Sequence, residues 1–309
     1  MRINNVYTKI RTDETLRETV SHGNAEYPFR YYLEDIWQFD LHCIDWHWHS
    51  EVEFVFVQKG RAAFLIGSQR YVLQEGDGIF INARILHRFE ADGQAVIPNM
   101  VFSPSLLSGE ESLIYRKYIQ PVLCSPVECL LLSPSVPWQK ETLDLLQAVF
   151  GMQQSDAPCE LDTVRLLLEI WGMIYAHLPP SRDHTHPKSA AHPQARLQIM
   201  MQYIHTYYAH PLSLEDIAKA AALSKSGALQ LFGRYLHVPP VRYLINYRLK
   251  QAARLLVTTE SSIALIAQNT GFESPGYFCR KFKELFKITP GEYRSRGNAP
   301  SNAPAESRR

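Results

Sequence analysis

A near-repeat in the last hundred residues constrains the fold of this chain more than any other feature. Two copies align at an offset of 49 residues in their first halves and 50 in their second halves, so the second copy has one extra residue at its centre. Each copy predicts a short helix, a tight turn and a second helix, which is the layout of a helix-turn-helix. The aligned residues are Ile217-Ala218 with Ile266-Ala267, Leu223 with Phe272, Phe232 with Phe282, Pro240 with Pro290 and Tyr243 with Tyr293.

Capping residues mark the helix ends of both copies. In the first copy, Asp216 follows Ser213 by three residues, an acidic relative of the capping box, and Ser224 can cap the second helix. In the second copy, Gly271 supplies the turn, where a positive φ is easiest for glycine. Ser274-Pro275 then gives an N-cap followed by proline at the first helical position. The pattern predicts an all-α domain.

Charge is distributed unevenly, although the total is only +1. Residues 1–178 contain 14 Lys and Arg against 23 Asp and Glu, whereas residues 194–296 contain 14 against 6. A basic segment beside an acidic one indicates that only the basic segment meets a polyanion. With the repeat, this predicts binding to double-stranded DNA by two recognition helices about 34 Å apart, in successive major grooves. An uneven scatter of surface charge is the alternative.

The first half of the chain predicts strands, and the middle predicts helices. Short apolar segments between Phe39 and Phe102 are separated by Gly-containing turns, which is typical of an antiparallel barrel or sandwich. One of these strands is expected over residues 46–57. Over residues 138–178, apolar residues recur at helical spacing and predict two amphipathic helices, packed on the barrel or on a second subunit.

Five motifs within residues 197–296 extend the repeat into a family pattern. They resemble the AraC/XylS family of transcription regulators, and the match includes both copies, their separation and the one-residue difference. The resemblance implies sequence-specific binding to promoter or operator DNA, RNA polymerase as a partner if the protein is an activator, and a homodimer formed by the helices at 138–178. The motifs are Leu214-Glu215-Asp216-Ile217-Ala218, Leu223-Ser224-Lys225-Ser226, Gly271-Phe272, Tyr277-Phe278-Cys279-Arg280-Lys281-Phe282-Lys283 and Thr289-Pro290-Gly291-Glu292-Tyr293-Arg294.

The first copy departs from this family pattern. Ala222 stands where the turn glycine is usual, so that turn is expected to be slightly strained. Gln230 lies where an arginine is usual and cannot neutralise a phosphate. We therefore expect the second copy to carry more of the DNA affinity. Expected phosphate contacts are Lys225, Arg280, Lys281 and Lys283; expected base-edge contacts are Ser226, Gly227, Gln230, Pro275, Gly276 and Tyr277; Arg234 and Ser274 complete the predicted DNA-binding set.

Three histidines and a glutamate in the strand region form a candidate site. On one strand, His47, His49 and Glu53 would share a face by period-two alternation, and His87 follows in a later strand. With Trp48, they predict an effector-binding pocket for a polar organic molecule, for which a sugar is one candidate. The same four His and Glu side chains are also a ligand set for Fe, Mn, Ni or Zn.

The spacing of these residues resembles the two short motifs of cupin barrels. Asn82 stands where proline is common, and Arg84 where glycine is common. The wider segment 28–120 resembles the effector-binding cupin domain of AraC-type regulators, which implies a sensor rather than an enzyme and no cofactor. A metal-binding sensor, or a cupin enzyme fused to a DNA-binding domain, remains the alternative.

The expected fold class is therefore α+β and multidomain. The cysteines are odd in number, five, and show no CxxC spacing, which predicts a reducing compartment. The N-terminus is polar and has no apolar run, which predicts a soluble, cytoplasmic protein. A proline- and histidine-rich stretch predicts a linker, with metal binding by its histidines as the alternative. The expected segments are a cupin-like sensor at 1–136, a helical extension at 137–178, a linker at 179–193, the double helix-turn-helix domain at 194–296 and a disordered tail at 297–309.

Overall fold

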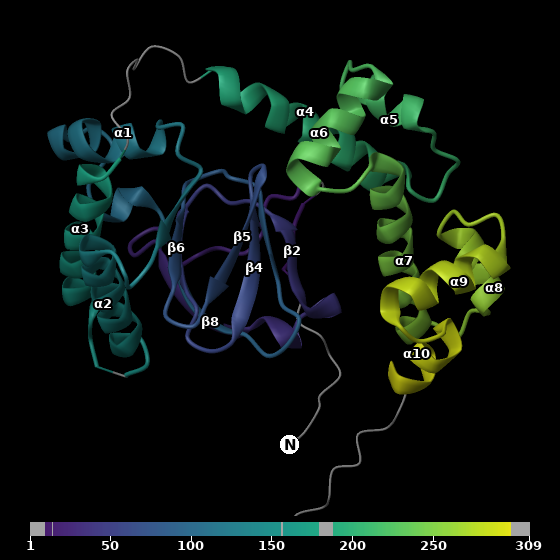
Figure 1. The fold of residues 1–309 in the computed structure, drawn as a ribbon, viewed down its shortest axis with the longest axis horizontal. Helices are drawn as coiled ribbons and strands as arrows, with labels where there is room; N and C mark the ends of the chain where they lie inside the picture. The colour runs from purple at the N-terminus through teal and green to yellow at the C-terminus, as the bar shows by residue number, and fades with distance from the viewer. Residues whose placement is uncertain (1–9, 14, 156, 179–187, 298–309) are drawn as a thin grey trace, which may run out of the picture. The chain divides into compact units, whose positions relative to one another are not determined.

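The computed structural model describes residues 10–297, apart from residues 14, 156 and 179–187 (Figure 1). The chain divides into two compact units, one ending at Arg196 and the other beginning at Leu197. Most of the predicted linker and the tail from residue 298 onward lie outside the described residues, and residues 188–193 belong to helix α4 (Lys188–Tyr207). No helix in the described part is both long and apolar enough to cross a bilayer.

The strands of the N-terminal unit form two antiparallel sheets, as the short strands and glycine turns predict (Figure 1). The larger sheet has the order β1-β8-β3-β6-β9 and the smaller sheet the order β2-β7-β4-β5. The strands are β1 (Phe29–Asp35), β2 (Cys43–His47), β3 (Val52–Phe56), β4 (Arg61–Ile66), β5 (Gln69–Gln74), β6 (Gly78–Ile81), β7 (His87–Glu90), β8 (Val96–Phe102) and β9 (Cys129–Leu132). Short helical turns are η1 (Ile36–Gln38), η2 (Asp40–His42), η3 (Pro104–Leu106), η4 (Tyr115–Ile119) and α1 (Gln120–Leu123).

Both faces of the larger sheet are buried. Val55 on its inner face meets Phe64 of the smaller sheet in one apolar core. Phe54, which alternation sends to the outer face, packs in a second core with helices α2 (Pro137–Met152) and α3 (Glu160–Ala176). Burying each such Phe or Leu side chain stabilises the unit by roughly 1.5–3 kcal/mol. The two predicted amphipathic helices are confirmed, and they pack on the sheet.

The single strand predicted over residues 46–57 is wrong. β2 ends at His47 and β3 begins at Val52, and the two strands belong to different sheets. The chain crosses between the sheets here because the connecting residues pair with other segments: Trp48 forms a bridge with Arg17, and the carbonyl of His49 accepts a hydrogen bond from the amide of Arg84. The apolar alternation continues across this crossing, so the sequence pattern does not reveal it.

The C-terminal unit contains the predicted repeat of two helix-turn-helix motifs. The first motif is α5 (Leu214–Ala220) and α6 (Lys225–Leu236); the second is α8 (Ile263–Asn269) and α9 (Pro275–Phe286). α7 (Pro240–Thr258) joins the motifs, and α10 (Pro290–Gly297) follows the second. The turn between α8 and α9 is one residue longer than the turn between α5 and α6, so the extra residue lies at the centre of the second copy, as predicted.

Side-chain caps fix the helix starts in both motifs. Ser213 and Asp216 form the two reciprocal hydrogen bonds of a capping box. The hydroxyls of Ser224, Ser262 and Ser274 each accept a hydrogen bond from the backbone amide three residues later, at 3.1–3.3 Å. Each such cap stabilises its helix by about 1 kcal/mol, and the caps at Ser213, Ser224 and Ser274 were predicted from the sequence.

Candidate functional site

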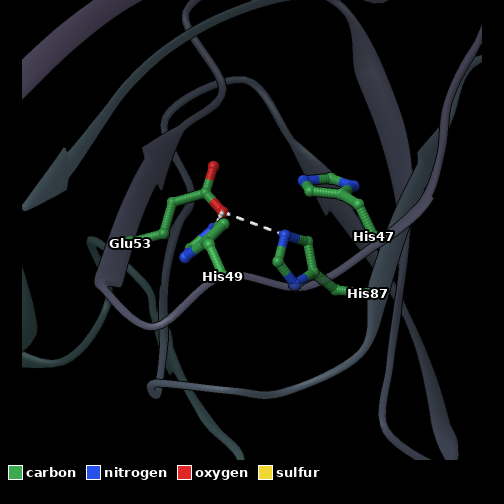
Figure 2. Close-up of side chains that lie close together, drawn as sticks. All are labelled: His47, His49, Glu53 and His87. Atoms are coloured by element: carbon green, nitrogen blue, oxygen red, sulfur yellow. Dashed lines mark hydrogen bonds and ion pairs between the residues drawn. The ribbon is translucent and has the colours of Figure 1, made fainter. Parts of the chain in front are cut away.

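Four side chains that could ligate a metal converge between the two sheets. His47 ends β2, His49 lies in the crossing, Glu53 is in β3 and His87 begins β7. Their ligand atoms all lie within 4.8 Å of one another, all four residues are buried, and Figure 2 shows their side chains pointing toward a common centre. The predicted set is therefore brought together, but by the crossing between sheets and not by alternation along one strand.

The three histidines are all held by the same kind of hydrogen bond, from Nδ1 to a backbone carbonyl. Nδ1 of His47, His49 and His87 lies 2.8, 3.1 and 2.7 Å from the backbone carbonyls of residues 45, 51 and 85. A carbonyl oxygen can only accept, so each Nδ1 carries the proton and donates it. In the neutral tautomer, Nε2 then carries the lone pair. A backbone carbonyl bonded to the other ring nitrogen is the usual partner of a histidine that ligates a metal.

Arg84 supports this arrangement from the backbone. Its φ is +63°, in the left-handed region, and its amide donates to the carbonyl of His49 at 2.8 Å. The sequence places Arg84 where glycine is common in cupins, and the structure shows why glycine suits the position. The strained backbone fixes the loop that carries His49.

The cluster is electrostatically coupled around the Glu53 carboxylate. Oε2 of Glu53 lies 3.4 Å from Nε2 of His49 and 3.2 Å from Nε2 of His87. Burial would raise the pKa of Glu53, but the adjacent His49 and His87 outweigh it and hold the pKa well below its ordinary value. Burial, together with repulsion from the neighbouring histidines, lowers the pKa of His47 and favours its neutral form.

These residues fit a divalent transition-metal ion. Three imidazoles and one carboxylate are ligands that suit Fe, Mn, Ni or Zn. Nε2 of His87 is fully buried, and its 3.2 Å contact with Oε2 of Glu53 is not a hydrogen bond when Nε2 carries the lone pair; buried polar atoms without a hydrogen bond are rare in stable proteins. An ion at the centre of the cluster would satisfy this atom. Exposed acidic groups are common without metals, but here every member is buried.

A cavity of about 150 Å³ adjoins the cluster and has further polar walls that the sequence reasoning missed. Its lining includes Glu18 and His22 from the segment before β1, Tyr32 and Glu34 on β1, and Asn99 on β8. Tyr32 pairs with Asn99 across the two strands, so both side chains point to the same inner face. Asn99 is a polar residue within the apolar strand VIPNMVF, a signal that could have revealed it; nothing in the sequence singles out His22.

Trp48 does not line this cavity, which corrects the predicted pocket. It lies between His47 and His49, and the local backbone turns its side chain toward the N-terminal segment. Its indole N–H donates to the carbonyl of Thr15 at 2.9 Å, and the guanidinium of Arg17 lies 5.8 Å from the ring centroid. Trp48 therefore anchors the segment that carries Glu18 and His22, and does not contact the cluster itself.

The second helix-turn-helix motif presents a basic surface. On α9, Arg280 and Lys283 are exposed, and the guanidinium of Arg280 lies 5.4 Å from the centroid of the half-buried Tyr277 ring. Lys281 is partly exposed and pairs with Glu284 at 2.6 Å. The start of the helix, Ser274 to Gly276, is exposed, and Phe278 and Phe282 fix the opposite face in the core.

The first motif presents fewer free charges. On α6, Ser226, Gln230 and Arg234 are exposed, and Gly227 is half-buried. Lys225 at the helix start pairs with Glu215 at 3.0 Å, and the same carboxylate also pairs with Lys219. A DNA phosphate would have to compete with this carboxylate for Lys225.

Comparisons with known proteins agree with this architecture. A model described as "Helix-turn-helix domain" matches residues 217–296, and a model described as "Cupin domain" matches residues 43–101. The HTH-type transcriptional regulator YdeC of Bacillus subtilis (strain 168) is 32% identical over 288 residues, which cover 91% of this chain and 97% of that protein. The chain belongs to the AraC family of transcription regulators.

Some other relatives of this AraC-family chain match about a third of it. The lactose operon transcription activator of Staphylococcus xylosus is 32% identical over 98 residues, which cover 32% of this chain and 35% of that protein. A solved AraC-type DNA-binding domain protein from Chromobacterium violaceum is 33% identical with a TM-score of 0.34, and the match covers 36% of this chain and 98% of that chain.

Proposed function

We propose that this AraC-family regulator changes its binding to promoter or operator DNA when a small molecule occupies the cavity between its sheets. The observation that carries the proposal is the buried cluster of His47, His49, Glu53 and His87 beside a cavity, in a chain that also contains two helix-turn-helix motifs. Buried polar groups converging on a cavity are typical of a ligand site. A ligand can shift DNA binding only by as much as its affinity differs between the two states of the protein.

The geometry favours the form of this proposal in which the cluster holds a divalent transition metal. The sequence alone favours a metal-free pocket, but two features support metal ligation: the Nδ1 hydrogen bond to a backbone carbonyl that all three histidines share, and the buried Nε2 of His87, which makes no hydrogen bond. The bound ion would supply a Lewis-acidic point to which a donor atom of the effector could bind. The cavity walls would orient the rest of the effector.

Metal analysis of the purified protein tests this form. We expect about one equivalent of metal in the wild type and loss of it in the His47→Ala, His49→Ala double variant, because two of the four ligands are gone. His42→Ala is a matched control, since His42 lies outside the cluster. Metal-free wild-type protein, or equal metal in both proteins, would leave the cluster as a purely organic pocket.

The same double variant tests the link to DNA. DNA fragments selected from a random pool by the wild type should still bind the variant, but the effector should no longer change their affinity. Unchanged regulation in a folded double variant would contradict the proposal. A cupin enzyme is the second candidate that the four ligands favour, and consumption of the effector by the wild-type protein would support it.

The proposal also includes the domain bounds, the pairing of two copies and the DNA-contacting residues. We assign the sensor to residues 1–136, the helical extension to 137–178, the linker to 179–193 and the DNA-binding domain to 194–296. Pairing of two copies through α3 is supported by Leu161 and Leu168, which are 84% and 44% exposed. The DNA-contacting residues would be those predicted on α6 and α9, RNA polymerase would be a partner if the regulator activates, and the protein would act in the cytoplasm.

A further inference from the structure

The cavity has a second polar group of residues, separate from the four metal-ligating side chains. We call Glu18, His22, Tyr32, Glu34 and Asn99 the outer cluster; all five line the cavity. Nδ1 of His22 lies 2.9 Å from the Tyr32 hydroxyl, and its Nε2 lies 3.4 Å from Oε2 of Glu18. The His22 and His49 rings pack edge to face with centroids 5.4 Å apart, so the outer cluster adjoins the metal-ligating set.

The outer cluster offers more acceptors than its own donors satisfy. The side-chain amide of Asn99 donates to Glu34 at 2.8 Å, and Glu18 has only the distant contact with His22. Nε2 of His22 is buried, and its 3.4 Å contact with Glu18 is not a hydrogen bond, so the cluster also contains an unsatisfied atom in a residue that lines the cavity. A ligand rich in N–H or O–H donors would satisfy these groups.

The charge of the lining favours a cation among such ligands. Outside the metal-ligating set, Glu18 and Glu34 contribute two carboxyl groups, and the one Lys or Arg among the described lining residues is Arg11, which is exposed. Burial raises the pKa of Glu34 to about 7, with further contributions from Glu53 and Glu18 and partial opposition from Asn99. A cation beside Glu34 would stabilise its ionised form.

The remaining walls and the volume limit the size of the ligand. Phe39, Ile44, Phe89 and Val101 supply apolar surface. A cavity of about 150 Å³ matches the size that accepts benzene in an engineered protein core. The ligand body is therefore apolar and of roughly six to ten non-hydrogen atoms.

We infer that the effector carries a protonated amine on a compact apolar body, and that Glu34 and Glu18 bind the ammonium group. This inference rests on the proposed function and narrows it to one chemical class of effector. His22, Tyr32 and Asn99 orient the two carboxylates and complete the hydrogen bonds. The end of the ligand away from the amine lies toward His49 and Glu53.

Calorimetric titration of the full chain with two isosteric probes tests the inference. Cyclohexylamine and cyclohexanol have the same shape, and only the amine is charged at pH 7. We expect the wild type to bind the amine at least tenfold more tightly than the alcohol, which corresponds to about 1.4 kcal/mol. Glu34→Gln should reduce this preference below about threefold, because the amide keeps the shape but not the charge. Glu26→Gln is the matched control, since Glu26 is exposed and outside the cavity lining.

Three results would overturn the inference: equal affinity for both probes, an amine preference that survives Glu34→Gln, or no saturable amine binding up to about 20 mM. D-ribose, titrated in parallel, would also overturn it by binding more tightly than the amine, and would assign the cavity to polyols. Sequence-selective DNA binding, measured on the same samples, separates these outcomes from failure of the proposed function. If that binding persists and responds to another compound, the regulator stands and only the ligand class is wrong.

Discussion

Ala222 and Gly271 occupy equivalent turns in the two helix-turn-helix motifs and have φ angles of +52° and +84°. Both positions need the left-handed region, which costs a residue with a Cβ about 1–2 kcal/mol. At Gly271 a Cβ would also lie 2.6 Å from the carbonyl oxygen of Tyr208 and 2.8 Å from Nε of Arg248. Arg248 donates to the carbonyls of Tyr208 and His210, so the second turn packs closely on the residues that follow α4.

Substitution at these two turns should have opposite effects on stability. Gly271→Ala should lower the free energy of unfolding of the DNA-binding unit by more than about 2 kcal/mol, because it adds both a strained φ and a backbone clash. Ala222→Gly should raise it by up to about 1 kcal/mol, because only strain is removed. Urea denaturation of the two variants provides the measurement. A Gly271→Ala variant as stable as the wild type would show that this turn can open.

Helices α6 and α9 have the same length and the same serine N-cap, yet they present different surfaces. α9 exposes Arg280 and Lys283, whereas α6 has Gln230 in place of a basic residue, and its Lys225 pairs with Glu215. Basic contacts with phosphates supply most of the salt-dependent affinity for DNA. We therefore expect α9 to contribute more of the DNA affinity than α6.

Single substitutions on α6 and α9 should show how much each helix contributes to the DNA affinity. Arg280→Ala should weaken DNA binding about tenfold and reduce the salt slope by about one, the effect of one lost phosphate contact. Gln230→Ala should change affinity by less than about threefold and leave the salt slope intact. Titrations of one DNA duplex at several salt concentrations measure both quantities. A larger loss for Gln230→Ala than for Arg280→Ala would reverse the assignment.

In the whole molecule, the sequence predicts more of the structure of the helical unit than of the sheet unit. Local signals determine where the helices begin: Ser213 with Asp216, and Ser274 before Pro275, act within one helical turn. The repeat also shows the same helix-turn-helix pattern in two places of the sequence. The cavity depends on contacts between distant segments, such as Tyr32 with Asn99. No local period encodes such pairings, so the outer cluster escaped prediction and Trp48 was placed wrongly.

The cluster of His47, His49, Glu53 and His87 was predicted in part. His47, His49, Glu53 and His87 were identified by residue type and spacing, and the structure brings them together. The reason given for their convergence, one continuous strand, was wrong, because β2 and β3 belong to different sheets. The set of residues was nevertheless predicted correctly, because the crossing between the sheets directs the same side chains inward.

The central claim is that the chain binds specific DNA through its two helix-turn-helix motifs. Fluorescence anisotropy of the full chain, with DNA from its own upstream region and a scrambled duplex at several salt concentrations, tests it most directly. We expect the chain to bind the native duplex more tightly than the scrambled one, with an affinity that falls steeply as the salt concentration rises. Weak and equal binding to both duplexes, with no sequence enriched by the protein from a random pool, would contradict it.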